Sequence, residues 1–180
     1  MEEKHVTHGF PPVYDQNSRI LILGSMPSVK SREVSFYYGH PQNRFWKVLS
    51  AVTGENFPDS IPGKREILLR RGIALWDVIA ECDITGSSDS SIRNVVPNDL
   101  SVILSGACIS AIFTNGSTAS GIYKKYQLPQ TGIAAVPLPS TSPANAAWTL
   151  DRLIQAWSVL ARFVLPDDSA EARAGICCIS

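Results

Sequence analysis

Short apolar segments recur along the chain, separated by polar segments and prolines. Four of them are rich in β-branched or small apolar residues and end in glycine, proline or a polar residue. They are residues 19–24 (RILILG), 72–79 (GIALWDVI), 111–115 (AIFTN) and 134–138 (AAVPL). Runs of this kind are typical of strands that are buried on both faces of a sheet. We therefore expect four strands at these positions.

Helical patterns lie between and after these runs, at residues 43–52, 64–71, 98–104, 118–126 and 144–164. In the last of them, apolar residues recur at spacings of three and four, which predicts a face packed on the sheet. Strands that alternate with helices indicate an α/β fold with a parallel sheet covered on both sides.

Ligands bind to such folds beyond the carboxyl ends of the strands. The segments that follow the expected strands are residues 25–42, 77–91, 116–118 and 139–145. We expect the chemistry of the protein to come from these four loops.

The whole chain sets further bounds. Its 180 residues, 44% of them hydrophobic, suit one compact domain, which we place at residues 1–165. Residues 166–180, rich in Ala, Asp and Glu, are expected to form a flexible tail. Basic and acidic residues are equal in number, 16 each. There is thus no global basic field, and a nucleic-acid partner would have to be held by a local patch.

Neither a membrane anchor nor a metal is expected. The sequence has no apolar run of the roughly 18 residues that span a bilayer and no signal-peptide core at its N-terminus, so we expect a soluble intracellular protein.

The cysteines, Cys82, Cys108, Cys177 and Cys178, form no C-x-x-C pair and are expected to be reduced thiols. The terminal CCIS matches a prenylation box, but no polybasic stretch accompanies it, and we interpret it as a chance match.

The first loop and the segment after it read GSMPSVKSREVSFYYGHPQNRFW. The loop is long for a strand-to-helix connection, and it combines aromatic residues with a histidine and small residues, which favours a binding loop. Composition alone leaves an alternative equally open. Tyr37 and Tyr38 would then be packing residues, and His40 and Pro41 would simply begin a helix. With only one glycine after the strand, the fingerprint of a nucleotide cofactor is absent, and no cofactor is expected.

The fourth loop, within PLPSTSPANA, carries three hydroxyl residues just before an expected helix. Hydroxyls and free backbone N–H groups at the start of a helix can bind phosphate without net charge. Helix capping by Ser142 or Asn145 is the alternative explanation.

Taken together, GSMPS, YYGHPQNRFWKVL, GIALWDVI and LPSTSPANA resemble, in order and spacing, the uracil-DNA glycosylase superfamily, especially its mismatch-specific and hypoxanthine branches. The H-P-x-N-R-F-W block is the most specific part. The resemblance implies a three-layer α/β sandwich, with a central four-stranded parallel sheet flanked by helices. It also implies flipping of a base out of DNA and hydrolysis of its N-glycosidic bond by water. The expected partner is DNA that contains a deaminated base. We expect the protein to be a monomer, in the cytoplasm with the nucleoid or in a eukaryotic nucleus.

One departure from the family pattern identifies the catalytic candidate. Many branches have an Asn or Asp in the first motif that positions water, but this chain has Met26 there, and a thioether cannot orient water. A similar loss marks the hypoxanthine branch, in which the Asn of the H-P-x-N block takes over. That residue is Asn43 here. Because an amide is a weak base, Asn43 would act by holding water below the anomeric carbon of an oxocarbenium-like centre.

The resemblance also implies a base pocket and a DNA-contacting loop. Tyr38 matches an aromatic residue that stacks on the flipped base, a contact worth roughly 1–3 kcal/mol. The expected base-binding residues are Tyr38, Asp77, Ser25, Met26 and His40. The expected DNA contacts are Ser140, Ser142, Pro143, Ala144 and Asn145.

Asp77 matches the residue that reads the base edge in relatives. Hypoxanthine has an N1–H donor where adenine has a bare nitrogen, so a carboxylate would accept a hydrogen bond from the first and repel the second. Uracil also has an N–H donor, and Asp77 does not exclude it. The plain alternative is a capping or surface acid.

Several basic residues could contact the phosphates of DNA. The alternative is that they are ordinary charged residues on a solvated face. The candidates are Lys30, Arg32, Arg44, Lys124 and Lys125. Trp46 and Trp76 are better interpreted as core or pocket wall.

Three other functions stay open. The first is a uracil or mismatch-specific glycosylase, and the second is a catalytically silent DNA-damage binder. The third, an α/β hydrolase, is disfavoured because the chain has no G-x-S-x-G nucleophile motif.

Overall fold

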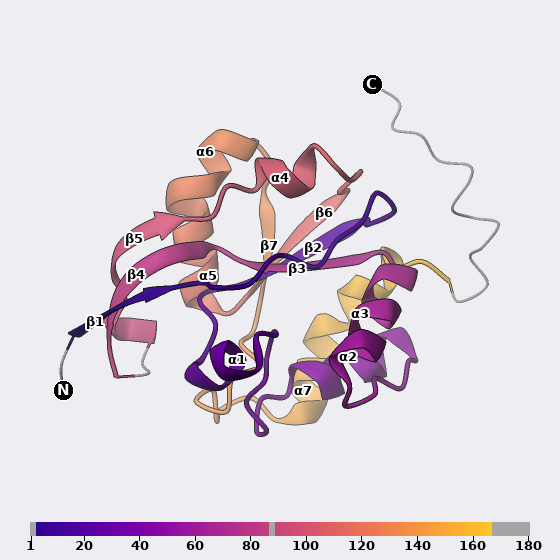
Figure 1. Ribbon diagram of the computed structural model, residues 1–180. Coiled ribbons are helices and arrows are strands. Elements are labelled where there is room, and N and C mark those ends of the chain that lie inside the picture. Colours follow the sequence, from indigo (N-terminus) through magenta and orange to yellow (C-terminus); the bar gives the residue numbers. More distant parts are fainter. Residues whose placement is uncertain (1–2, 87–88, 167–180) are drawn as a thin grey trace.

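A four-stranded parallel sheet forms the centre of the computed structural model, which describes residues 3–86 and 89–166 (Figure 1). The strands are β2 (Ile20–Gly24), β3 (Ile73–Asp77), β6 (Ala111–Asn115) and β7 (Ala135–Leu138), in the order β3-β2-β6-β7. All four expected strands are present. The side chains from Ile20 to Leu23 point alternately to the two faces of the sheet, and all are fully buried, so the sheet is covered on both sides.

A second, antiparallel sheet was not expected. Its strands are β1 (Glu3–Thr7), β4 (Ile79–Thr85) and β5 (Arg93–Pro97), in the order β1-β4-β5. Only Val78 separates β3 from β4, so the prediction that residues 77–91 form a loop is wrong over its first half. β4 (IAECDIT) was missed because charged residues interrupt its apolar positions and several of its residues are only half-buried.

Helices occur in all five expected segments with shifted ends, and two further short helices, at Val29–Val34 and Leu128–Thr131, were not expected. They are α1 (Val29–Val34), α2 (Phe45–Thr53), α3 (Ile61–Arg70), α4 (Ser101–Leu104), α5 (Ser117–Ile122), α6 (Leu128–Thr131) and α7 (Leu150–Trp157). A π-helix at Tyr123–Gln127 joins α5 to α6, and 3-10 turns occur at Asp89–Ser91 and Ser158–Arg162.

Two helix expectations are corrected. The segment 25–42 contains the short helix α1, which Ser28 caps by accepting a hydrogen bond from the Ser31 N–H. The last helix begins at Leu150 rather than 144, because Thr149 caps it by accepting from the Arg152 N–H.

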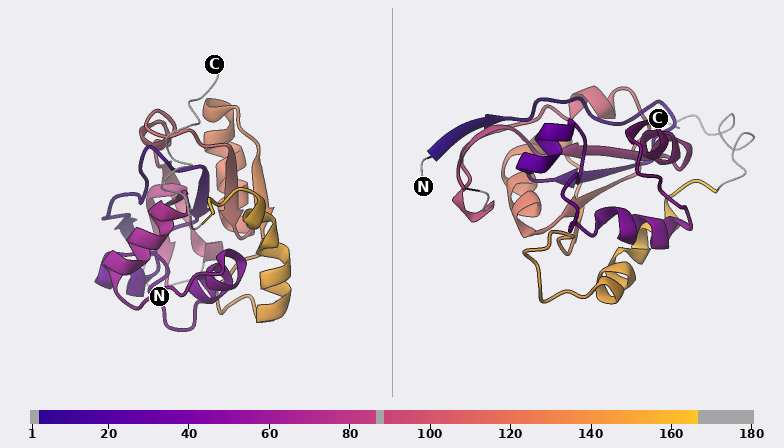
Figure 2. Two further views of the ribbon diagram at one scale, coloured as in Figure 1. Left: turned by 90° about the vertical axis from the view of Figure 1, so that its right-hand side faces the viewer. Right: turned by 60° about the horizontal axis from the view of Figure 1, so that its bottom comes forward.

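Helices flank the parallel sheet, as the sequence predicts. Figures 1 and 2 show α2, α3 and α7 grouped at one end of the molecule and α5 and α6 away from them. Phe45 of α2 meets Trp157 of α7 edge to face, with ring centroids 5.8 Å apart, and both rings are fully buried. Val13 pairs with Leu75 and covers the outer edge of β3.

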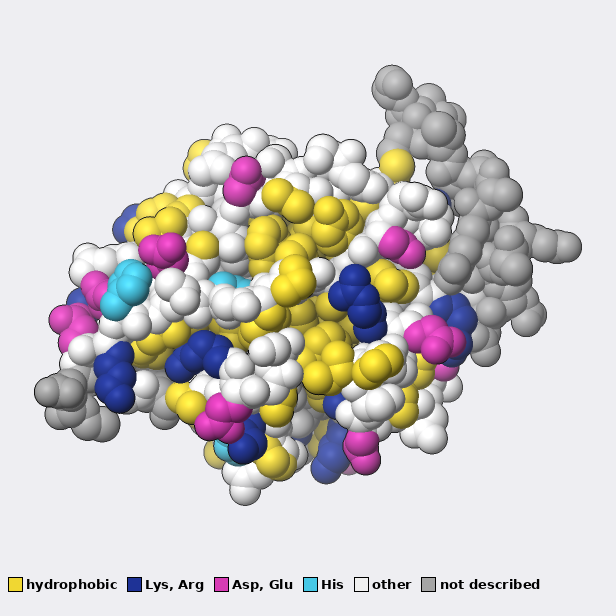
Figure 3. Space-filling view, in the orientation of Figure 1, with side chains coloured by type: hydrophobic (Ala, Val, Ile, Leu, Met, Phe, Trp, Pro, Cys, Tyr) yellow, Lys and Arg dark blue, Asp and Glu magenta, His cyan; other side chains and the backbone are white. Residues whose placement is uncertain are grey.

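Other expectations concern the chain as a whole. Among the described residues, no helix is long and apolar enough to cross a membrane. Cys82 is a buried free thiol, as expected, whereas Cys108 is disulfide-bonded, which contradicts the reduced state expected for it. The expected tail and the CCIS terminus lie outside the described residues, apart from residue 166. Figure 3 shows basic side chains interspersed with acidic ones on one face, without a dominant basic patch.

Candidate active site

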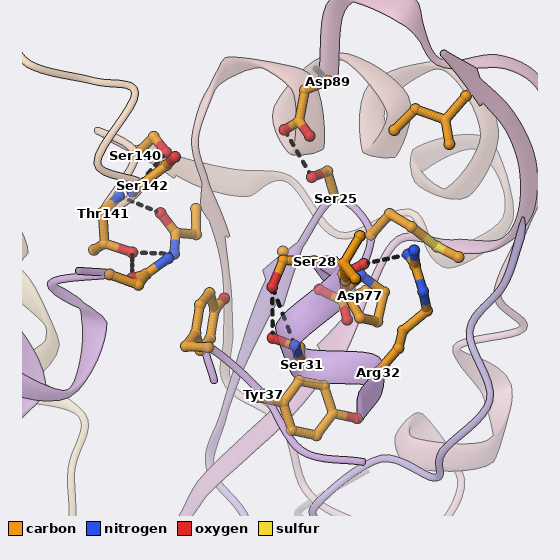
Figure 4. Close-up of a pocket in the computed structure, with 18 of the residues that line it drawn as sticks. Ser25, Ser28, Ser31, Arg32, Tyr37, Asp77, Asp89, Ser140, Thr141 and Ser142 are labelled. Atoms are coloured by element: carbon orange, nitrogen blue, oxygen red, sulfur yellow. Dashed lines mark hydrogen bonds between the residues drawn. The ribbon is translucent and has the colours of Figure 1, made fainter. Parts of the chain in front are cut away.

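A cavity of about 170 Å³ lies beyond the carboxyl ends of the parallel strands (Figure 4). This volume is below the roughly 300–1,000 Å³ of sites for drug-sized ligands, which suits a group the size of one nucleobase. The parallel sheet and the loops that follow its strands contribute Gly24, Ser25, Met26, Tyr38, Asn43, Asp77, Asn115, Ser140, Thr141 and Ser142 to its wall. The antiparallel sheet and the connection between β4 and β5 contribute Ile84, Gly86 and Asp89.

The backbone on either side of Asp77 is fixed by buried amide side chains. The Asn98 side chain donates to the carbonyls of Asp77 and Ile79, at 2.9 and 3.0 Å. Gln127 Nε2 donates to the carbonyls of Val78 and Asn98. The Val78 N–H donates to the Gly24 carbonyl and links the start of β4 to the end of β2. Asp77 therefore sits on rigid backbone where the two sheets meet.

The carboxylate of Asp77 is buried, with 4% of the residue exposed. Its Oδ2 lies 2.7 Å from Nε2 of His8, a histidine that is itself 6% exposed. Its Oδ1 lies against Gly24, where a Cβ atom would come within 2.3 Å of that oxygen. Among the hydrogen bonds of the described residues, none uses Oδ1. Gly24 is thus required by the close approach of the carboxylate, and Oδ1 is left for a ligand.

The orientation of the Asn43 amide is fixed by two donors. The Phe45 N–H and the Thr141 hydroxyl each donate to Oδ1 at 2.9 Å. Because a backbone N–H can only donate, the oxygen of the amide must face Phe45, and the amide cannot be flipped. Thr141 is itself fixed, since its hydroxyl accepts from Asn115 Nδ2 and its N–H donates to Asn115 Oδ1. No hydrogen bond within the described residues uses Asn43 Nδ2, so this amide offers a ligand two N–H donors.

Tyr38 lines the same cavity and stacks its ring on Phe45, at 3.8 Å between centroids and 16° between planes. Its φ of 52° is in the left-handed region, which a tyrosine adopts only when its surroundings hold it there. Burial, and then the charge of Asp77, raise the pKa of the Tyr38 hydroxyl, which is therefore neutral at physiological pH. One face of the ring is covered by Phe45, which leaves the other for a flat ligand.

Ser25 and Met26 also border the cavity, as expected, but His40 does not. The Ser25 hydroxyl donates to Asp89 Oδ2 at 2.9 Å. His40 is exposed, its Nδ1 accepts from the Gln42 N–H, and it lines a neighbouring groove beside Trp46. The structure therefore brings together four of the five expected base-binding residues.

Arg44 does not face phosphate as the sequence suggested. Its guanidinium donates to the carbonyls of Thr141, Ser142, Asn145 and Trp148. An arginine with its donors committed to four carbonyls acts as a brace for the loop after β7. The loop that positions Thr141 beside Asn43 is thus held by the residue that follows Asn43.

The expected DNA-contacting residues lie in the loop after β7, five or more residues before α7 begins. They are therefore not at a helix N-terminus, and the prediction of a phosphate site at such a terminus is wrong. Instead, the Ser142 N–H donates to the Ser140 hydroxyl, and the Ala144 N–H donates to the Ser142 hydroxyl. Pro143 and Ala144 are exposed, while Ser140, Ser142 and Asn145 are half-buried. Ser140, Ser142, Ala144 and Asn145 line a second, open groove that adjoins the cavity.

The remaining basic candidates differ in exposure. Arg32 is half-buried and borders the cavity, whereas Lys30, Lys124 and Lys125 are exposed. Lys30 is paired with Glu33 at 2.8 Å, and Arg32 donates to the Pro27 carbonyl at 2.7 Å. Lys124 and Lys125 are exposed on the π-helix, and Lys125 lies over the Tyr126 ring. Among the described residues, no group of three metal-ligating side chains is arranged to hold an ion.

Sequence reasoning missed two contributors to the site and misassigned a third. His8 lies in an N-terminal segment to which no element was assigned, and Asn115 was placed only as the end of a strand. Thr141 was grouped with the phosphate-binding hydroxyls. Asn115 could have been predicted as a site residue from its position at the end of a parallel strand, but no local sequence signal points to His8.

Comparison with known proteins agrees with this geometry. The family model of the uracil DNA glycosylase superfamily matches residues 11–161, so the chain belongs to that superfamily. A hypoxanthine DNA glycosylase of Methanosarcina barkeri is 37% identical over 139 residues, which are 76% of this chain and 87% of that protein. A hypoxanthine DNA glycosylase of Methanosarcina acetivorans is 35% identical over 148 residues, which are 82% of this chain and 93% of that protein.

A solved structure extends the comparison to the fold. The solution NMR structure of a candidate uracil DNA glycosylase from Methanosarcina acetivorans superposes with a TM-score of 0.74 at 37% identity. The match covers 87% of this chain and 96% of the other. The predicted family and fold are confirmed. The protein is a DNA glycosylase, a hydrolase that acts on N-glycosyl bonds.

Proposed function

We propose that this glycosylase removes hypoxanthine from DNA, with Asp77 reading the base edge and Asn43 holding the attacking water. The observation that carries the proposal is the juxtaposition of the free Oδ1 of Asp77 and the free Nδ2 of Asn43 in one base-sized cavity. A hydrogen bond from N1–H of hypoxanthine satisfies Oδ1, whereas adenine would leave this oxygen buried and facing a lone pair. The names of the two relatives support the same substrate.

Asn43 has a limited chemical role in this proposal. Both donors to Oδ1 come from the protein, so the amide meets water through Nδ2 as a hydrogen-bond donor. Such a contact places the water oxygen but does not remove its proton. The reaction therefore proceeds through an oxocarbenium-like sugar, with the C–N bond largely broken before water adds. The bond electrons leave with the base as an anion, which takes up a proton from solvent, and the added water loses its proton to solvent after attack.

The flipped base would extend the stack that Tyr38 makes with Phe45. The loop of Ser140, Ser142, Pro143, Ala144 and Asn145 would meet the DNA backbone along the groove that adjoins the cavity. This loop contacts phosphate through hydroxyl and amide groups and carries no charge of its own. In this proposal one copy of the protein binds the DNA.

The decisive experiment uses purified protein and duplexes with a single hypoxanthine, uracil, xanthine or adenine. Rates of base release are measured in single turnover, and the abasic product is cleaved with alkali. We expect hypoxanthine to be released fastest and adenine to be left intact. Faster release of uracil would make the protein a uracil glycosylase, and tight binding of damaged DNA without base release would make it a damage binder.

The same assay tests the reaction type. Release should be unaffected by a chelator, and borohydride should trap no protein–DNA adduct, because the sequence motifs supply no metal ligands and no catalytic lysine. Loss of activity with the chelator, or a covalent adduct, would contradict hydrolysis by free water.

A further inference from the structure

His8 is a buried polar residue that the function proposed above does not use. It follows β1 directly, and its ring packs near Phe10 and Tyr37, with centroid distances of 4.6 and 6.1 Å. Both ring nitrogens have partners. Nδ1 lies 2.9 Å from the Phe10 carbonyl, and Nε2 lies 2.7 Å from Asp77 Oδ2. A buried histidine bonded at both nitrogens and touching the base-reading residue needs an explanation.

The hydrogen-bond partners determine where the protons are. A carbonyl can only accept, so Nδ1 carries a proton and donates it to Phe10. The contact between Nε2 and Oδ2 then requires one more proton, placed between these two atoms. If it is on Nε2, the pair is an imidazolium beside a carboxylate. If it is on Oδ2, a neutral imidazole accepts from a carboxylic acid. In both states the pair is neutral overall, and Oδ1 carries no proton.

We propose that His8 is a specificity-determining positioning residue that keeps Asp77 Oδ1 a hydrogen-bond acceptor and so restricts the site to bases with an N–H at that edge. The inference rests on the proposed reading of the base by Asp77. It extends that reading, because the base selectivity is then a property of the His8–Asp77 pair. The selected class is hypoxanthine, xanthine and uracil, and the rejected class is adenine and cytosine, which have a bare ring nitrogen there.

Without His8, the buried carboxyl group would have no fixed proton. Its Oδ2 would lose the one hydrogen-bond partner that the described residues give this carboxyl group. A proton on Asp77 could then settle on Oδ1, which would donate to a bare ring nitrogen. The site would accept bases that it now rejects.

Strand register delivers His8 to this position. Thr7 pairs with Glu81 in the β1–β4 ladder, and the His8 N–H continues the ladder by donating to the Ala80 carbonyl at 2.8 Å. A shift by one residue would turn the ring to the other face of the strand. The antiparallel sheet therefore places one component of the base-recognition site.

The test compares His8→Leu, which removes both hydrogen bonds, with His8→Gln, whose amide can still donate to Oδ2. Affinities are measured by fluorescence anisotropy on duplexes with 2′-fluoro-deoxyinosine or 2′-fluoro-deoxyadenosine, in which the fluorine slows bond cleavage. We expect His8→Leu to lower the inosine-to-adenosine affinity ratio by about tenfold or more, and His8→Gln to retain most of it. His5→Gln, which alters an exposed histidine of the strand that precedes His8, should leave the ratio unchanged.

Equal weakening of both duplexes in His8→Leu and His8→Gln would show a purely structural role and overturn the inference. Failure of the wild-type protein to prefer inosine would instead overturn the proposed function.

A second measurement needs neither folded variants nor DNA. Long-range ¹H–¹⁵N spectra of the wild-type protein should show a proton on the His8 Nδ1, as its hydrogen bond to the Phe10 carbonyl requires, with Nε2 hydrogen-bonded. A neutral ring protonated only on Nε2 would refute the arrangement.

Discussion

The two sheets contribute different kinds of residue to one cavity. The parallel sheet, with its fully buried central strand, supplies Asp77 and Asn115 directly and carries the loops of Asn43 and Thr141. The antiparallel sheet is half-exposed, and it supplies His8 and part of the cavity rim. The residues proposed to act on the sugar and the base, Asn43 and Asp77, are thus positioned by the central sheet. His8, which is proposed to keep Asp77 a hydrogen-bond acceptor, is positioned by the peripheral antiparallel sheet. Rate and base selectivity should therefore respond to substitutions in different regions.

The largest effect is expected for Asn43→Ala on the central side. Loss of a positioned catalytic group should slow single-turnover release of hypoxanthine by about a hundredfold or more, with DNA affinity nearly unchanged. The selectivity between hypoxanthine and adenine should persist, because the His8–Asp77 pair is untouched. A folded Asn43→Ala protein with a normal rate would reduce Asn43 to a capping residue for α2.

Asn43→Asp is the matched control for this change. A carboxylate keeps the hydrogen bonds from Phe45 and Thr141 and still offers an atom to water. It should retain far more activity than Asn43→Ala. Equal losses in both variants would show that the Nδ2 donor itself is indispensable.

A smaller loss is expected for Tyr38→Ala. A stacked aromatic is worth roughly 1–3 kcal/mol, so release of the damaged base should fall by about tenfold or more, while binding of undamaged DNA changes little. Tyr38→Phe retains the ring and serves as the control. Equal losses in base release and undamaged-DNA binding would assign Tyr38 a structural role only.

A weaker effect should follow Thr141→Val, which keeps the shape of this fully buried side chain but removes its hydroxyl. Asn43 then loses one of two orienting donors, and Asn115 Nδ2 loses its acceptor. Activity should fall by about three- to tenfold, and the free energy of unfolding by about 1–3 kcal/mol. Thr141→Ser should behave like the wild type. Full activity in Thr141→Val would show that the role of Asn43 does not depend on these hydrogen bonds.

The smallest effect concerns Asp89, on the peripheral side. Desolvation at the cavity raises the pKa of Asp89, the hydrogen bond from Ser25 lowers it, and the charge of Asp77 raises it further, with a net increase. Because the folded-state pKa lies above the unfolded value, ionised Asp89 disfavours the folded state above that pKa, and the penalty disappears as the pH falls through it. Asp89→Asn should raise Tm at pH 7 by on the order of 1 °C and have no effect in acid.

Asp99→Asn provides a control of opposite sign. Hydrogen bonds from Ser101 lower the pKa of Asp99, so its carboxylate stabilises the fold at neutral pH and this contribution is lost as the pH falls. Asp99→Asn should therefore lower Tm at pH 7. Tm shifts of the same sign in both variants would contradict the two assignments.

The two sheets also differ in how far the sequence predicts them. The central strands are continuous apolar runs whose partners follow from the alternation of strands and helices. Asp77 ends one of these strands, and Asn43 lies in the connection that follows another. β1 and β4 have charged residues at several positions, and their pairing joins residues as far apart in the sequence as His5 and Asp83, which are 78 positions apart. A local sequence pattern cannot encode a pairing over such a separation. The contact of His8 with Asp77, 69 residues away, depends on that register and could not be predicted.

Arginine at position 44 was misinterpreted for a related reason, since charge alone does not reveal which acceptors a guanidinium will find. Its four carbonyl acceptors come from a loop about a hundred residues later in the chain, with separations from 97 to 104. The start of α7 was placed too early because the apolar spacing continues into the preceding turns, and Thr149 proved to be the cap.

The bonds from Arg44 have a consequence for how the loop after β7 exchanges with solvent. One guanidinium donates to the carbonyls of Thr141, Ser142, Asn145 and Trp148. This segment therefore cannot open one residue at a time without breaking the shared hydrogen bonds. The backbone amides of Ser142, Asn145 and Trp148, which are bonded within the loop, should therefore exchange their hydrogens for deuterium with a single common opening free energy. In Arg44→Lys, whose ammonium cannot span four carbonyls, these amides should exchange faster and independently of one another.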